Sequence, residues 1–145
     1  IKQANSSLVT DDFMIIARVE SLILNKGIDD ALNRAFSYID AGAKGIMIHS
    51  KKSDGEEIIE FCKLFRKKAL STPLIVVPST FSHMTEDELS KIGVNVVIYG
   101  NHLIRSSYPA MVKTAKSILK HSRSKEASEK HCMSIKDILT LVPEK

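Results

Sequence analysis

The sequence has few cysteines, no long apolar run and no signal-peptide pattern at its start. Its two cysteines, Cys62 and Cys132, lie far apart and lack the spacing of a zinc site or a disulfide framework, so we expect two reduced thiols. The apolar runs are far shorter than the roughly 20 residues that cross a bilayer. These absences predict a soluble, cytoplasmic protein with no membrane partner.

Nucleic-acid recognition is not indicated either. The formal charge is +4, from 21 Lys and Arg against 17 Asp and Glu, and the basic excess lies at 63–68 and 113–130. Phe65 is the one aromatic residue in these segments and no nucleic-acid-binding motif is visible, so we expect solvated helix faces and no nucleic-acid partner. The phosphate-loop motifs GxGxxG and GxxxxGK[ST] are absent, and no Ser, His and Asp set points to a catalytic triad.

With 145 residues, of which 43% are hydrophobic, the chain can form one domain or part of a larger one. Four short apolar runs lack polar alternation, which is typical of parallel strands covered on both faces. These runs are 13–19, 45–49, 74–78 and 94–99.

The segments between these runs have helical spacing. The expected helices follow Gly27, extend over 54–69, start at the Thr85 and Glu88 capping box, and extend over 106–122. An alternation of strand and helix, repeated four times, predicts an α/β fold with a parallel sheet and right-handed crossovers.

Four such units form either a small open sheet or half of a (β/α)8 barrel, which needs about 250 residues. Because the first residue is Ile1 and not Met, we expect the chain to begin inside a longer protein. Residues 1–122 are therefore assigned to the C-terminal half of a barrel. Residues 123–145 are assigned to a polar linker, "RSKEASEKH", and a terminal helix capped by Ser134, whose apolar side carries Ile135, Ile138, Leu139 and Val142.

Polar residues lie at the carboxyl ends of all four predicted strands. The carboxyl ends of parallel strands meet at one edge of the sheet, where binding sites form. Arginine offers a planar fork for phosphate or carboxylate, and histidine and serine add further donors. The pattern predicts an anion-binding rim for an acidic small molecule, formed by Arg18, Glu20, His49, Ser50, Ser79, Thr80, Asn101 and His102.

A purely structural role is open for each of these residues. Arg18 could pair with Glu20 for stability alone, and His49 could be a core histidine whose hydrogen bonds are satisfied. Ser79 and Thr80 could cap the turn that follows their strand. Asn101 and His102 could fix the last loop.

The segment "ARVESLILNKGIDDALNRAFSYIDAGAKGIMIHSKKSDGEEIIEF", followed by "VVPSTF" and "VIYGNHLIRSSYPAM", closely resembles the C-terminal half of the phosphoenolpyruvate mutase family. That family belongs to the isocitrate lyase superfamily of (β/α)8 barrels, so the resemblance implies barrel strands five to eight. The carbon-carbon lyases of the superfamily typically have Arg-Thr-Asp in place of Arg18-Val19-Glu20, and Glu in place of His49. The chain is therefore similar to the phosphonate branch.

The resemblance implies an isomerase, an intramolecular phosphotransferase that interconverts phosphoenolpyruvate and phosphonopyruvate in phosphonate biosynthesis. In such an enzyme Mg2+ holds the pyruvyl part, and Arg18 and His49 match the catalytic residues that hold the phosphoryl group. Ser50, Ser79, Thr80 and Asn101 are expected to contact the substrate, and Glu20 to lie beside the metal without binding it directly. The metal ligand of the family lies in the first half of the barrel, so the chain alone is expected to be inactive.

Two other functions stay open. A phosphonopyruvate hydrolase shares the "ARVE", "HS" and "GNH" segments, and a non-catalytic half barrel could act as an interaction module. The missing N-terminal half is the first expected partner. Because members of the superfamily exchange C-terminal helices, the resemblance also implies a homo-oligomer.

Overall fold

The structure, a computed structural model, describes residues 1–141. It divides into two compact units, one from Ile1 to Gly100 and one that starts at Asn101. Each unit is described by itself.

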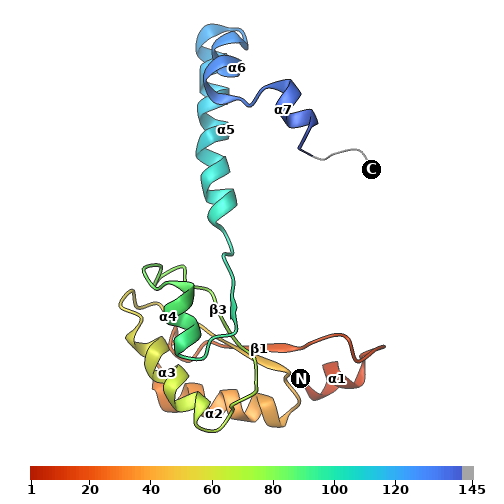
Figure 1. The fold of residues 1–145 in the computed structure, drawn as a ribbon, viewed down its shortest axis with the longest axis vertical. Helices are drawn as coiled ribbons and strands as arrows, with labels where there is room; N and C mark the ends of the chain where they lie inside the picture. Colours follow the sequence, from red (N-terminus) through yellow and green to blue (C-terminus); the bar gives the residue numbers. More distant parts are fainter. Residues whose placement is uncertain (142–145) are drawn as a thin grey trace. The chain divides into compact units, whose positions relative to one another are not determined.

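The first unit is an α/β structure with a parallel sheet (Figure 1). Its strands are neighbours in the order β1-β2-β3-β4, and each pair is parallel. This confirms the predicted α/β class and the strand-helix alternation. The elements are α1 Lys2–Ser6, β1 Ile16–Val19, α2 Gly27–Asp40, β2 Gly45–Ile48, α3 Glu56–Arg66, β3 Leu74–Val76, α4 Glu86–Lys91 and β4 Val96–Val97.

The core lies between the sheet and helices α2, α3 and α4, which gather on one side of it in Figure 1. Val19, Ile48 and Val76 are register partners across three strands and are fully buried. Phe61 and Phe65 of α3 are equally buried in the same cluster. Burying such a side chain contributes about 1.5–3 kcal/mol, so this layer is the main source of stability.

The other face of the sheet has a different character. Side chains alternate along a strand, so the row Arg18, Met47, Ile75 and Val96, paired in register, lies opposite the helix layer. Arg18 is exposed, and Val96 is 45% exposed. The helices of the described chain cover only one face, although Ile75 on the other face is only 4% exposed. Full cover of both faces stays a prediction.

The ends of the helices explain why the sequence forms these elements. Thr85 accepts from the Glu88 N–H, and the Glu88 carboxylate accepts from the Thr85 N–H, which confirms the predicted capping box. After α4 the chain turns at Gly93, whose φ of +95° is costly for other residues.

Arg66 connects the end of α3 to the loops at the amino ends of β3 and β4. Its guanidinium donates to the carbonyls of Gly93, Ala69 and Thr72, the last two at 2.7 Å. It also donates to Asn95 Oδ1 at 2.7 Å. One side chain therefore satisfies several carbonyls that helix and loop ends would otherwise leave without partners.

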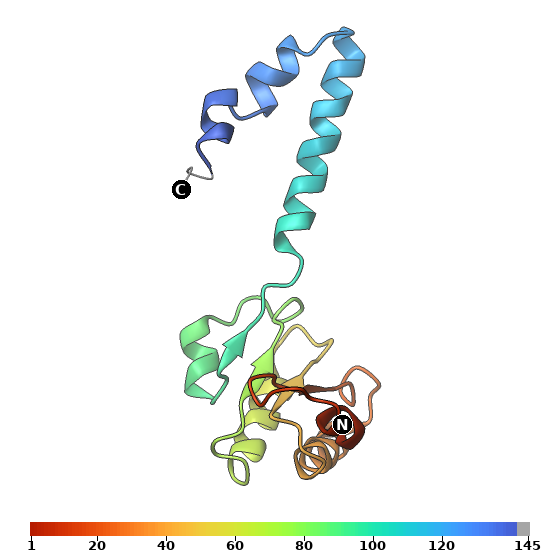
Figure 2. The same cartoon turned by 90° about the vertical axis from the view of Figure 1, so that its right-hand side faces the viewer.

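The second unit contains three helices among its described residues: α5 His102–His121, α6 Lys125–His131 and α7 Ile135–Leu139. Helix α5 starts four residues before the predicted 106–122 and is continuous through Pro109 (Figure 2). Ser134 caps α7 by accepting from the Asp137 N–H, as predicted. In α7, Ile135, Ile138 and Leu139 are exposed; Val142 lies outside the described residues.

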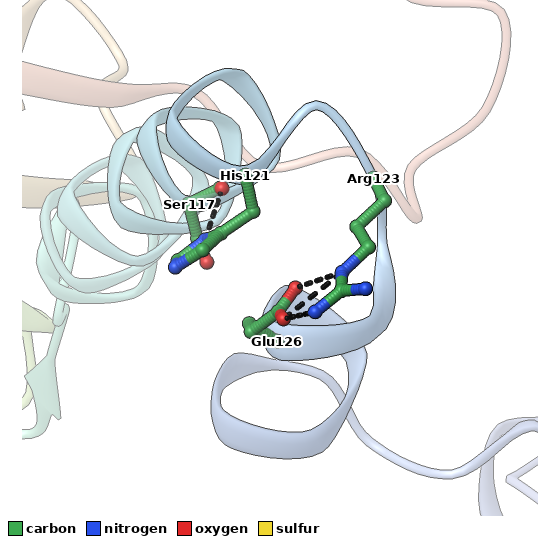
Figure 3. Close-up of polar contacts among 4 residues, drawn as sticks. All are labelled: Ser117, His121, Arg123 and Glu126. Carbon is green, nitrogen blue, oxygen red and sulfur yellow. Dashed lines mark hydrogen bonds and ion pairs between the residues drawn. The ribbon is translucent and has the colours of Figure 1, made fainter.

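The segment 123–131, expected as a polar linker, is largely helical, so that prediction is wrong. Alanine, glutamate and lysine favour helices, and Ala127 is buried where α6 packs on α5. Figure 3 shows the turn between the two helices. There Arg123 binds both carboxylate oxygens of Glu126, and the His121 Nδ1–H donates to the Ser117 carbonyl at 2.8 Å. The proposed division at Ser122 stays a prediction.

None of the helices in the described chain has the length and apolar character that a membrane span requires.

Candidate functional site

Arg18, Glu20 and His49 form a polar cluster at the carboxyl ends of β1 and β2. Arg18 pairs in register with Met47, and His49 lies two residues further along, on the same face as Met47. The Arg18 Nη2 group lies 2.7 Å from His49 Nδ1, and Arg18 Nε makes an ion pair with Glu20 Oε1. The structure thus brings together the two residues expected to hold the phosphoryl group.

The contact with Arg18 fixes the tautomer of His49. A guanidinium has only donors, so Nδ1 must accept, and the proton of the neutral ring is then on Nε2. Burial, and then the positive charge of Arg18, lower the pKa of His49, while Glu20 opposes this effect. At neutral pH His49 is therefore an uncharged ring that presents an Nε2–H donor.

The cluster suits an anion of small size. Arg18 and Glu20 have side chains that are 48% and 40% exposed, so a ligand can reach them. An arriving phosphoryl group would compete with Glu20 for the guanidinium and could accept from the Nε2–H of His49. The structure contains both the pairing of Arg18 with Glu20, which a structural role predicts, and the contact of Arg18 with His49, which an anion site predicts.

Ser50 and Thr80 have partners outside this cluster. Ser50 is 1% exposed; its hydroxyl donates to Glu57 Oε2 at 2.7 Å and accepts from the Lys52 N–H at 3.1 Å. The Thr80 hydroxyl donates to the Ser50 carbonyl at 2.7 Å. Direct contact of either side chain with a substrate stays a prediction.

Ser79 and Asn101 occupy turns at the ends of their strands. The Ser79 N–H donates to the Val77 carbonyl at 2.8 Å. Ser79 follows Ile75 and Val77, whose side chains lie on the same face of the sheet as Arg18. Asn101 belongs to the second unit and precedes α5. The roles of Ser79 and Asn101 in binding stay predictions.

Sequence reasoning missed Glu57, which lies in the first turn of α3 and contacts both Ser50 and Lys52. Lys52 Nζ lies 2.9 Å from Glu57 Oε1. The signal was present: Ile46, Ile48 and Ser50 share one face by alternation, and that face is the one covered by α3.

The described residues contain no group of three or more His, Cys, Asp or Glu side chains that could hold a metal ion. Glu20, the acidic residue of the cluster, is already paired with Arg18. The residues present therefore do not fit a Mg2+ site by themselves.

A concavity with a volume of about 680 Å³ lies elsewhere, along the outer side of α3. Its lining is a single helix stripe that includes Ile59, Lys63 and Lys67. Since a functional site needs convergent polar groups, the Arg18 cluster is the better candidate.

Comparisons with known proteins give the family of the chain. A family model described as phosphoenolpyruvate phosphomutase matches residues 1–119. The phosphoenolpyruvate phosphomutase of Tetrahymena pyriformis is 37% identical over 118 residues, which are 81% of this chain and 38% of that protein.

Two solved structures resemble the chain closely. A phosphoenolpyruvate phosphomutase from Streptomyces platensis subsp. rosaceus is 33% identical with a TM-score of 0.86, over 95% of this chain and 47% of the other. A phosphonopyruvate hydrolase in complex with oxalate and Mg++ is 34% identical with a TM-score of 0.85, over 95% of this chain and 48% of the other.

The chain spans less than half the length of each of these three proteins. The family match covers far more than half of the chain, and the fold and the identities agree with it. The chain therefore belongs to the phosphoenolpyruvate phosphomutase family.

Proposed function

We propose that this chain is the C-terminal half of a (β/α)8 enzyme that interconverts phosphoenolpyruvate and phosphonopyruvate. The observation that carries the proposal is the contact between Arg18 and His49 at the ends of adjacent parallel strands, in a chain of this family. The sequential strand order and the sheet face left without helices support a half barrel, because a barrel closes with eight strands. The chain covers 47% of the solved phosphomutase structure, which supports the expectation of a missing half.

The reaction moves a phosphoryl group within one molecule. Starting from phosphonopyruvate, the P–C bond breaks and a P–O bond to the enolate oxygen forms, so no water is consumed. Such a transfer depends on positioning the group and on neutralising charge on its oxygens. Arg18 supplies a fixed cation with paired donors, and His49 supplies the Nε2–H donor, so both act on the phosphoryl oxygens.

Mg2+ is proposed as the cofactor because a related hydrolase was solved with Mg++ and oxalate. The described part of this chain offers no set of ligands for it. We therefore assign the metal ligands to the missing half and derive no step of this chain through the metal.

A phosphonopyruvate hydrolase is the second candidate. The hydrolase structure resembles this chain as closely as the mutase structure does, with 34% against 33% identity. In that reaction the P–C bond breaks and water accepts the phosphoryl group, giving pyruvate and phosphate. The third candidate, of another class, is a half barrel that binds a partner without catalysis.

A product assay distinguishes the three candidates. The complete barrel, containing this chain and its first half, is incubated with phosphonopyruvate and Mg2+ and followed by 31P NMR. We expect phosphoenolpyruvate with little free phosphate, and no turnover by the chain alone. Phosphate as the main product would establish the hydrolase, and no turnover by the complete barrel would favour the interaction module.

A further inference from the structure

Ser21 and Ser50 are the two buried polar residues in the part of the chain that the structure describes, 2% and 1% exposed. They occupy equivalent places, because each lies two residues beyond the register pair Val19 and Ile48. Each also directly follows a residue of the Arg18 cluster, since Ser21 follows Glu20 and Ser50 follows His49. The burial of two serines at matching positions calls for a common cause.

Both serines donate to a carboxylate on the helix that follows their strand. Ser21 Oγ donates to Asp30 Oδ2 at 2.6 Å, and Ser50 Oγ donates to Glu57 Oε2 at 2.7 Å. Each carboxylate also pairs with a cation: Asp30 with Arg34 at 2.8 Å, and Glu57 with Lys52 at 2.9 Å.

Both carboxylates are held in the charged form. Arg34 first, and then Ser21, lower the pKa of Asp30. Burial alone would raise the pKa of Glu57, but the hydrogen bonds from Ser50 and Lys52 bring it below its ordinary value. A charged acceptor makes a stronger hydrogen bond with a buried hydroxyl than a neutral one does.

Two further hydrogen bonds hold Ser50, one to its carbonyl and one to its hydroxyl. The Thr80 hydroxyl, from the loop after β3, donates to the Ser50 carbonyl at 2.7 Å, and the Lys52 N–H donates to Ser50 Oγ. Neighbouring residues on an extended chain point to opposite faces. Fixing Ser50 on the helix side therefore fixes His49 on the side of Arg18.

We propose that Glu57, Ser50 and Thr80 are positioning residues for the phosphoryl site, and that they act on the ligand through His49. They hold the backbone so that Nδ1 of His49 meets Arg18 and its Nε2–H is presented to a phosphoryl oxygen. Ser21 and Asp30 do the same for Glu20. This assignment rests on the proposed function and gives Ser50 and Thr80 a role that needs no direct contact with the substrate.

The first test follows the His49 ring in the 145-residue chain by 15N NMR, with its signals assigned from a His49→Gln variant. Glu57→Ala removes the acceptor, whereas Glu57→Gln keeps an acceptor oxygen and serves as the conservative variant. Thr80→Val removes one hydroxyl from an exposed residue and should leave the fold intact. Asn95→Ala is the stability control, because it removes acceptors for Arg66 and Leu74 near the opposite ends of the strands.

We expect wild type and Glu57→Gln to show one His49 tautomer with the proton on Nε2. In Glu57→Ala and Thr80→Val the ring should lose its contact with Arg18 and show the averaged tautomers of an exposed histidine such as His83. Wild-type signals in both variants would overturn the proposal. An equal change of the His49 signals in Asn95→Ala would also overturn the proposal, because the signals would then report the overall stability of the fold.

The second test measures turnover of phosphonopyruvate by the complete barrel. Glu57→Ala and Thr80→Val should lower kcat/KM about tenfold or more, because small misplacements of a binding group are costly, and Glu57→Gln should stay close to wild type. Unchanged turnover in Glu57→Ala would contradict the positioning role. An inactive wild type whose His49 ring responds as described would instead refute the proposed function and leave the positioning of His49 established.

Discussion

Arg18 and His49 meet because of the register between two parallel strands. Arg18 lies beside Met47, and His49, which directly follows β2, lies on the same face as Met47, so the guanidinium reaches Nδ1 at 2.7 Å. Glu20, which directly follows β1, pairs with the same guanidinium. The cluster therefore combines a fixed cation, a neutral donor and a carboxylate that a ligand must displace.

The first prediction concerns Arg18 in the complete barrel. Arg18→Ala should lower kcat/KM for phosphonopyruvate about a hundredfold or more, equivalent to about 3 kcal/mol of transition-state stabilisation. Arg18→Lys should not restore activity, because a point charge cannot replace the paired donors of a guanidinium. Steady-state kinetics would measure this, with the exposed Arg123→Lys as the control. Near-normal turnover in Arg18→Ala would remove Arg18 from the site.

A second prediction concerns the two thiols. Burial raises the pKa of Cys62 to about 12, whereas Cys132 is exposed. At pH 8 only about one Cys62 in ten thousand is then a thiolate, so it should resist alkylation in the folded chain. Iodoacetamide followed by intact-mass analysis should give one modification natively and two in denaturant. Two rapid modifications of the folded chain would show that the core around Cys62 is open.

Much of the first unit could be predicted from the sequence. Four apolar runs located the four strands, and Thr85 with Glu88 located the start of α4, because these signals are local. The helical character of 125–131 was missed, since its polar residues suggested a linker and the buried contact of Ala127 with α5 is tertiary.

The same distinction holds for the site. Arg18 and His49 were predictable because parallel strands bring their carboxyl ends together. Alternation places Ser50 on the same face as Ile48, but its hydrogen bond also depends on the reach of Glu57 from α3, which is a tertiary contact.

The third prediction concerns Arg66. Arg66→Met should lower the free energy of unfolding by about 3 kcal/mol, because the part-buried carbonyls of three residues and the Asn95 amide oxygen lose their donor. For a unit of about 100 residues this corresponds to a fall in Tm of more than about 10 °C. Thermal unfolding by circular dichroism measures it, with Arg123→Met as an exposed control that should change Tm little. Equal melting of the two variants would show that water replaces the Arg66 contacts.

A fourth prediction concerns pH. The pKa of His49 is lowered in the folded chain, so below its ordinary value of about 6.5 the unfolded state binds the proton first. The contribution of His49 to stability is therefore complete above about pH 6.5 and decreases as the pH falls toward its folded pKa. The carboxylates with lowered pKa, such as Glu57, lose their contributions only at more acidic pH. Urea unfolding at about pH 7.5 and 5.5 should show a steeper decrease in wild type than in His49→Gln; equal slopes would contradict the shift.

The last prediction concerns assembly through helix α7. Ile135, Ile138 and Leu139 are 77%, 57% and 74% exposed within their unit, and burying three such side chains against a second subunit would contribute on the order of 4 kcal/mol before ordering entropy is subtracted.

We expect the chain to form an oligomer whose mass depends on this stripe, because an apolar stripe of this kind usually marks a contact surface. Replacing all three residues by serine should lower the mass measured by light scattering, whereas Lys136→Ser, on the same helix, should leave it unchanged. The alternative is that α7 folds back onto its own chain; the triple variant would then keep its mass and melt at a lower temperature. If the triple variant had an unchanged mass and an unchanged Tm, the stripe would contact neither a second subunit nor the rest of its own chain.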